Sequence, residues 1–127
     1  MSFTPVNSVV WMEIPVRDID RGMAFYSNVF GHELTRDDTG PNPMAIFPVE
    51  NMETGVSGHL YPGEPAQGGN GPTIHMQVQD GLENAADRCW RAGGTVKSDP
   101  IAIPAGRFQY ILDPDGNSIG LFEPTKA

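Results

Sequence analysis

The chain of 127 residues has one cysteine, Cys89, and no long run of apolar residues. A single cysteine excludes a disulfide within the chain, and the first residues do not resemble a basic and apolar signal segment. We therefore expect a reducing, cytoplasmic location. Because a helix needs about 20 consecutive apolar residues to cross a bilayer, we expect no membrane-spanning segment.

Basic residues are also scarce, since 8 Lys and Arg stand against 16 Asp and Glu and give a net charge of −8. Such a chain on average repels phosphate backbones and anionic lipid, so neither nucleic acid nor a membrane is an expected partner. The length fits one domain, which buries about two thirds of its unfolded surface and needs no stabilising cross-link.

What is present is an internal repeat at an offset of 62 residues, which needs no insertion or deletion. The offset relates Val16 to Val78, Asp18 to Asp80, Ala24 to Ala86, Gly31 to Gly93, Gly58 to Gly120 and Pro62 to Pro124. These identities fall before a helix, inside it, just past its end and in a last strand. We expect two modules, about residues 8–62 and 72–124, joined by a Gly- and Pro-rich linker at about 63–71.

Hydrophobic periodicity predicts the same element order in both modules. The first has a strand at 9–16, a helix from an N-cap at Asp18 to a stop at Gly31, and strands at 33–36, 44–49 and 55–61. The second has a strand at 73–79, a helix that ends at Gly93 and Gly94, and strands at 95–97, 107–112 and 117–123. The sequence therefore predicts an α+β fold of two βαβββ modules. Its eight strands curl round a cleft with the helices outside.

The mixed face of each first strand is where chemistry is expected, because the helix must cover the apolar face. Glu13 and His75 occupy matched positions on these faces, and a pair of this kind can act as general acid and base. The alternative is that both are ordinary polar residues on a wetted surface or a subunit contact. Trp11 is either a flat wall for a planar ligand or a core aromatic.

Three further side chains have two interpretations each. Phe108 and Tyr110 share one side of their strand and either reach a pocket or only pack. Arg107 either attracts an anionic group or is a solvated charge. Cys89 lies on an apolar helical stripe and is expected to be a small buried hydrophobe rather than a nucleophile, and His32 is expected to be solvated.

These residues resemble the vicinal oxygen chelate superfamily, which includes glyoxalase I, extradiol dioxygenases and the fosfomycin and bleomycin resistance proteins. The resemblance spans nearly the whole chain and is carried by the segments 13–18, 24–31, 92–94 and 113–117. It is closest to the glyoxalase-related subgroup. It is fairly specific for the fold and says little about the reaction.

The resemblance implies four positions, here called seats, at which metal enzymes of the superfamily carry metal ligands. In this chain the four seats hold Trp11, Thr73, Gly58 and Gly120. None of these residues has a side chain that binds a metal in such sites, and a catalytic divalent ion needs about three protein ligands. We therefore expect no metal and no other cofactor. A displaced metal site remains an alternative, because Glu13, His75 and His59 lie near the same seats.

The expected function is binding of a small organic molecule in the cleft, for sequestration or for acid–base chemistry by Glu13 and His75. Trp11, Thr73, Arg107 and Tyr110 would shape the pocket, and Gly58 and Gly120 would leave space in it. The resemblance also implies a homodimer. Two alternatives stay open: a metal-dependent lyase or extradiol-type dioxygenase, and a non-enzymatic binder that sequesters a drug.

Overall fold

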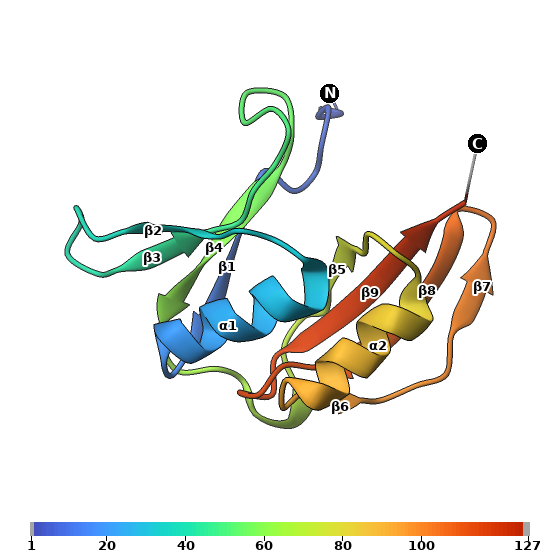
Figure 1. Ribbon diagram of the computed structural model, residues 1–127. Coiled ribbons are helices and arrows are strands. Elements are labelled where there is room, and N and C mark those ends of the chain that lie inside the picture. Colours follow the sequence, from blue (N-terminus) through green and yellow to red (C-terminus); the bar gives the residue numbers. More distant parts are fainter. Residues whose placement is uncertain (1, 126–127) are drawn as a thin grey trace.

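Each half of the chain folds into a small sheet with one helix on it (Figure 1). The computed structural model describes residues 2–125. The first module comprises β1 Trp11–Val16, α1 Ile19–Phe30, β2 Thr35–Asp37, β3 Met44–Ile46 and β4 Ser57–Pro62. After the short 3-10 helix η1 Gln67–Gly69, the second comprises β5 Ile74–Gln77, α2 Leu82–Arg91, β6 Thr95–Val96, β7 Ile101–Ile103, β8 Gly106–Leu112 and β9 Ser118–Pro124. The mixed α+β class is confirmed.

The strands form two separate sheets rather than one curled sheet of eight strands. The first has the order β1-β4-β3-β2, and the second has the order β5-β9-β8-β6 with β7 also paired to β8. In each sheet the first strand of the module pairs in parallel with the last, and the other pairs are antiparallel. The expected single sheet around a cleft is therefore not what the strand pairing within this chain forms.

The predicted ends of α1 are confirmed. Asp18 is the N-cap, and its carboxylate accepts hydrogen bonds from the backbone N–H groups of Asp20 and Arg21 at 3.0 and 3.1 Å. Gly31 closes the helix in the left-handed conformation, with φ 68° and a bond from its N–H to the carbonyl of Ser27.

The repeated Asp80 has a different role from Asp18. The N-cap of α2 is Gly81, which has no side chain to accept a bond, and the carboxylate of Glu123 accepts one from the N–H of Leu82 instead. Asp80 forms a bidentate ion pair with Arg88. The sequence identity at this position therefore does not carry the same function in both modules.

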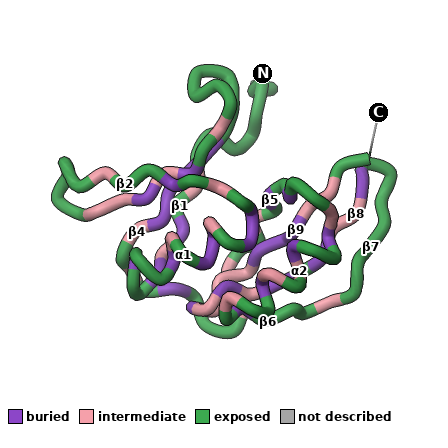
Figure 2. Tube along the Cα trace, viewed as in Figure 1, coloured by how far each residue is buried: buried purple, intermediate pink, exposed green. Residues whose placement is uncertain are grey.

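One hydrophobic core serves both modules. It joins residues of β1, α1 and β4 to residues of β5, α2, β8 and β9, and it includes Ile14, Leu60, Met76 and Leu121. Figure 2 shows buried positions along the two helices and the central strands, while the N-terminal segment and β7 are exposed. Cys89 is fully buried in this core, as expected, and burial raises the pKa of its thiol to about 12.

The β8–β9 turn ties the second module to α1 of the first. The predicted tight turn at 113–116 is present, and the buried carboxylate of Asp113 accepts a hydrogen bond from Tyr26 on α1 at 2.8 Å. Asp115, also buried, forms ion pairs with Arg17 and Arg21. These contacts, together with the shared core, join the two modules.

Strand register shows that the repeat carries a shift of one residue. Glu13 pairs with His59 across β1 and β4, so an unbroken offset of 62 would pair His75 with Leu121. His75 pairs with Gly120 instead. The counterpart of Gly120 in the first module is therefore His59 and not Gly58, and the expectation of a repeat without insertion or deletion is wrong in the last strands.

Candidate functional site

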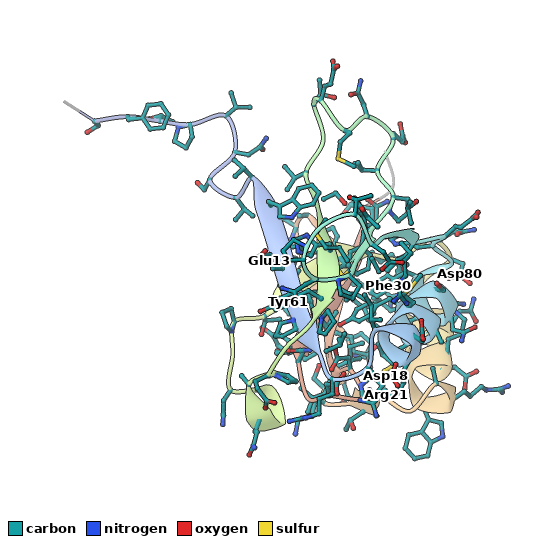
Figure 3. The ribbon with its side chains drawn as sticks, turned by 90° about the vertical axis from the view of Figure 1, so that its left-hand side faces the viewer. Glu13, Asp18, Arg21, Phe30, Tyr61 and Asp80 are labelled. Atoms are coloured by element: carbon teal, nitrogen blue, oxygen red, sulfur yellow. The ribbon has the colours of Figure 1, made fainter. Side chains whose placement is uncertain are left out.

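Each sheet has an outer face, which we define as the face that its helix does not cover. Figure 3 shows Glu13 and Tyr61 on one side of the first sheet and Phe30, on α1, on the other. Because strand neighbours alternate, Trp11, Glu13 and His59 share the outer face of the first sheet, while Ile14 and Leu60 face the core.

On the first outer face, His59 is held between two neighbours. The indole Nε1–H of Trp11 donates a hydrogen bond of 2.9 Å to His59 Nδ1. His59 Nε2 lies 3.3 Å from the carboxylate Oε1 of Glu13. The His59 side chain is 9% exposed and that of Glu13 is 64% exposed, so the carboxylate is the part of this cluster that solvent reaches. The expectation that His59 points away from Gly58 is confirmed.

On the second outer face, His75 lies within an aromatic cluster. Its ring centroid is 5.2 Å from that of Phe108 and 5.9 Å from that of Tyr110, and these two rings are 5.3 Å apart. All three pairs meet edge to face, a favourable arrangement for aromatic rings. A hollow of about 480 Å³ adjoins the cluster, lined by His75, Gln77, Ile103, Phe108 and Phe122.

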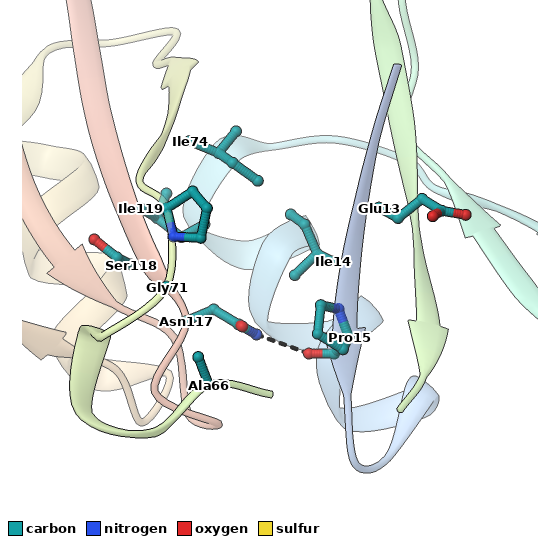
Figure 4. Close-up of a pocket in the computed structure, with 10 residues that line it drawn as sticks. Glu13, Ile14, Pro15, Ala66, Gly71, Ile74, Asn117, Ser118 and Ile119 are labelled. Carbon is teal, nitrogen blue, oxygen red and sulfur yellow. Dashed lines mark hydrogen bonds between the residues drawn. The ribbon is translucent and has the colours of Figure 1, made fainter. Parts of the chain in front are cut away.

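Glu13 and His75 are not brought together within one chain. Figure 4 shows Ile14 turned toward Ile74 and Ile119 across a small cavity of about 150 Å³, and Glu13 turned to the other side of β1. His75 follows Ile74 on β5 and therefore points away from that cavity. Among the described residues, no hydrogen bond, ion pair or aromatic contact joins Glu13 to His75. Each contacts its own module.

Gly58 and Gly120 do not leave the space that the sequence suggested. A Cβ atom at Gly58 would lie 2.1 Å from Met12 Cγ, and one at Gly120 would lie 2.2 Å from His75 Nδ1. The reason is that a neighbouring side chain leans across each glycine from the paired strand. These glycines make room for Met12 and His75 rather than for a ligand.

Arg107 and Tyr110 lie on opposite faces of β8. Arg107 forms ion pairs with Glu83 of α2 and with Glu123 of β9, in each case at 2.9 Å. Hydrogen bonds from Arg107 lower the pKa of Glu83 to about 2 and also lower that of Glu123. The Arg107 charge is therefore balanced by two carboxylates on the helix side of the sheet and does not face the aromatic hollow.

Thr73 is engaged by a neighbour, since its hydroxyl shares a hydrogen bond with that of Ser118. It also lines a cavity of about 590 Å³ between the modules, whose walls include Met12, His32 and Phe47. His32 is only partly exposed, and its Nδ1 is buried without a hydrogen-bond partner. The expectation of a solvated His32 is wrong, because its ring packs against Phe30 and Phe47.

The donor set does not fit a divalent metal at the seats that the resemblance implies. Trp11 offers an N–H donor, Gly120 lies under the His75 ring, and Thr73 is hydrogen-bonded to Ser118. With the register shift, the position in the first module that corresponds to Gly120 is occupied by His59. The Nδ1 atom of His59 already accepts a hydrogen bond from Trp11. In the described residues, no group of three or more His, Cys, Asp or Glu side chains is arranged to hold a metal.

The two helices within residues 2–125 are not membrane-spanning segments. Neither helix in this range has the length and apolar content to cross a bilayer.

Comparisons with known proteins agree with this architecture. The sequence model of the Glyoxalase/Bleomycin resistance protein/Dioxygenase superfamily matches residues 8–121. A glyoxylase-like domain-containing protein of Didymella fabae is 27% identical over 116 residues, which are 84% of this chain and 86% of that protein.

Two further relatives come from Streptomyces. The anthracycline biosynthesis protein DauV of Streptomyces sp. (strain C5) is 27% identical over 121 residues. The match covers 95% of this chain and 43% of DauV, so the chain spans less than half of that relative. The crystal structure of TnmS3, an antibiotic binding protein from Streptomyces sp. CB03234, is similar with a TM-score of 0.64 and 25% identity, and the match covers 96% of this chain and 100% of TnmS3.

Proposed function

The chain belongs to the Glyoxalase/Bleomycin resistance protein/Dioxygenase superfamily, and on that basis we propose that it binds a small aromatic organic molecule on the outer face of its second sheet. The observation that carries this proposal is the hollow of about 480 Å³ beside His75 and Phe108. Binding there uses aromatic packing and no metal at the family's usual seats.

The walls of the hollow suit a planar ligand. Ligand sites in proteins are mostly apolar with a few placed polar groups, and here Ile103, Phe108 and Phe122 supply apolar surface while His75 and Gln77 supply hydrogen-bonding groups. Because Phe108 and Tyr110 pack against the ring of His75, this wall of the hollow is preorganised for a ligand. A preset wall lowers the entropic cost of binding.

Charge favours a cationic ligand over an anionic one. The net charge of −8 gives the whole molecule a field that attracts cations. The side chain expected to attract an anion, Arg107, is paired with Glu83 and Glu123. The similarity to TnmS3, an antibiotic binding protein, supports the same class of function, namely retention of an organic molecule without a required reaction.

We include a second copy of the chain in this proposal. Within one copy, Glu13 and His75 do not point toward each other (Figure 4). An enclosed cleft between them therefore needs the first sheet of one copy and the second sheet of another. The N-terminal segment supports this arrangement because Phe3, Val6, Val9 and Val10 are all strongly exposed. Apolar surface gathered in this way marks contact with a partner.

Acid–base chemistry by Glu13 with His75 of a partner is the second candidate. The observation in its favour is the contact of Glu13 with His59, which gives the carboxylate a fixed position on an otherwise open face. A metal-dependent reaction has no comparable support, because the side chains at the usual seats do not provide the donors.

A fluorescence titration with daunorubicin, a planar and cationic probe, tests the binding proposal. Phe108→Ala is expected to raise Kd roughly tenfold, since an aromatic contact contributes about 0.5–1.5 kcal/mol beyond area burial and tenfold corresponds to about 1.4 kcal/mol. Trp90→Ala is the matched control, because Trp90 is 71% exposed on α2 and far from the hollow in the fold. Equal Kd values for the Phe108 and Trp90 variants would contradict the proposal.

A further inference from the structure

The cluster on the first outer face fixes the tautomer of His59. Trp11 Nε1–H is a donor and has no acceptor function, so the Nδ1 atom that it contacts at 2.9 Å must carry a lone pair. A neutral imidazole with a lone pair on Nδ1 carries its proton on Nε2. That Nε2 atom lies 3.3 Å from Glu13 Oε1, which is within ion-pair distance.

Among the described residues, no Lys or Arg side chain forms an ion pair with Glu13. His59 is the one basic side chain of residues 2–125 within ion-pair distance of Glu13. In its neutral form, the imidazole ring carries no charge that would cancel that of the carboxylate.

Two carboxylates elsewhere in the fold are paired with arginine side chains. Glu123 is paired with Arg107, and the buried Asp115 is paired with Arg17 and Arg21. Glu13 differs because its neighbour is the nearly buried imidazole ring of His59, while its own side chain is 64% exposed. One carboxylate oxygen is held, and the other is available to a ligand.

Aromatic side chains flank this carboxylate. Trp11 precedes Glu13 by two residues on the same face of β1, and Tyr61 follows His59 on β4, with ring centroids of His59 and Tyr61 6.1 Å apart. A carboxylate beside an accessible aromatic ring is an arrangement that binds organic ammonium groups, through the ion pair and through cation–π contact. Trp11 is 40% exposed, so a ligand can reach its ring.

We propose that Trp11, His59 and Glu13 form an amine-binding site on the outer face of the first sheet. Glu13 is the group that contacts the ligand ammonium. His59 and Trp11 are positioning residues: Trp11 selects the Nε2–H tautomer of His59, and His59 holds one oxygen of Glu13. The site lies on the first sheet and the aromatic hollow on the second, and in the proposed homodimer the two face each other across the shared cleft. The tautomer of His59 and the response to Glu13→Gln test this site apart from daunorubicin binding.

The tautomer is measured first, by long-range proton–nitrogen NMR correlation of the His59 ring at a pH where the ring is neutral. The wild-type chain is expected to show one tautomer, with the proton on Nε2. Trp11→Phe keeps an aromatic ring and removes the N–H donor, so it is expected to give a mixture of tautomers. A Nδ1–H form or a mixture in the wild type would overturn the proposal.

Ligand recognition is measured by NMR titration with benzylamine, with benzyl alcohol as the uncharged probe. Glu13→Gln is expected to weaken benzylamine binding at least tenfold and to leave benzyl alcohol unchanged. Glu50→Gln removes the same charge from a loop residue and is the matched control, expected to bind benzylamine like the wild type. If Glu13→Gln and Glu50→Gln bind benzylamine equally, Glu13 does not contact the ammonium and the proposal fails. A wild type that binds benzylamine no better than benzyl alcohol contradicts it as well.

Discussion

At the scale of single residues, strand alternation decides which candidate side chains can meet. The sequence predicts Glu13 and His75 at matched positions on the faces of β1 and β5 that the helices do not cover, but whether those two side chains meet depends on packing between the modules. The same holds for Arg107 and Tyr110, which are close in sequence and lie on opposite faces of β8. The hydrogen bond from Trp11 to His59 joins residues 48 positions apart, and no local sequence pattern predicts it.

The fit of His75 over Gly120 gives a prediction at this scale. A methyl group at residue 120 would lie 2.2 Å from His75 Nδ1, so Gly120→Ala should push the ring away from Phe108. Overpacking of this kind costs roughly 1–3 kcal/mol, and urea unfolding measures it. Gly40→Ala is the control, since its Cβ would meet its nearest neighbour at 3.9 Å. Equal stability of the two variants would contradict the close approach.

His32 gives a second prediction, on pH. Burial lowers the pKa of His32 from its usual value of 6.5, so the folded state binds a proton less readily than the unfolded state. Above about pH 6.5 this difference in pKa does not change the free energy of unfolding. As the pH falls below that value, it lowers the free energy of unfolding. His32→Phe should reduce the loss of unfolding free energy between pH 7.5 and 5.5, as measured by urea denaturation. An unchanged loss would show that His32 titrates freely in the fold.

At the scale of elements, helix and strand positions were largely predictable because local signals define them. Asp18 and Gly31 bound α1 as predicted, and each predicted strand overlaps an observed one. The strand β7 was missed, since its three exposed residues lie in a segment with Pro100 and Pro104 and carry no burial pattern. The register shift in β4 and β9 was also missed, because identical glycines at an offset of 62 suggested a pairing that the strands do not adopt.

The unequal roles of the repeated aspartates predict unequal effects on stability. Asp18→Ala removes the acceptor for two backbone N–H groups at the start of α1 and should cost about 1 kcal/mol. Asp80→Ala removes an exposed ion pair with Arg88 and leaves the start of α2 capped by Glu123, so its effect should be smaller. Urea unfolding of the two variants compares them. A larger loss for Asp80→Ala would mean that the N-cap assignment does not govern stability here.

At the scale of the whole molecule, the sequence predicted the two modules and their α+β class. The way they meet could not be predicted from the chain alone. It depends on tertiary contacts such as Tyr26 with Asp113 and Arg21 with Asp115, which join α1 to a turn about 90 residues later. Glu13 and His75 do not meet within one copy (Figure 4), and the proposal of a shared cleft requires a second copy.

Association is therefore predicted at this scale. Light scattering at micromolar concentration should give about twice the chain mass of 13.8 kDa. Val10 is 75% exposed in the apolar N-terminal segment, so Val10→Asp should shift the mass toward one copy. Trp90→Asp on the exposed side of α2 should not. A mass of one copy for the wild type would contradict the proposed homodimer.

The most direct test of the central claim, that the outer face of the second sheet binds an aromatic organic molecule, is amide NMR mapping of the chain with daunorubicin. We predict that the largest shifts occur at His75, Gln77, Phe108 and Phe122, around the hollow of about 480 Å³. Largest shifts confined to α1 and α2, or no saturable shifts at all, would contradict it.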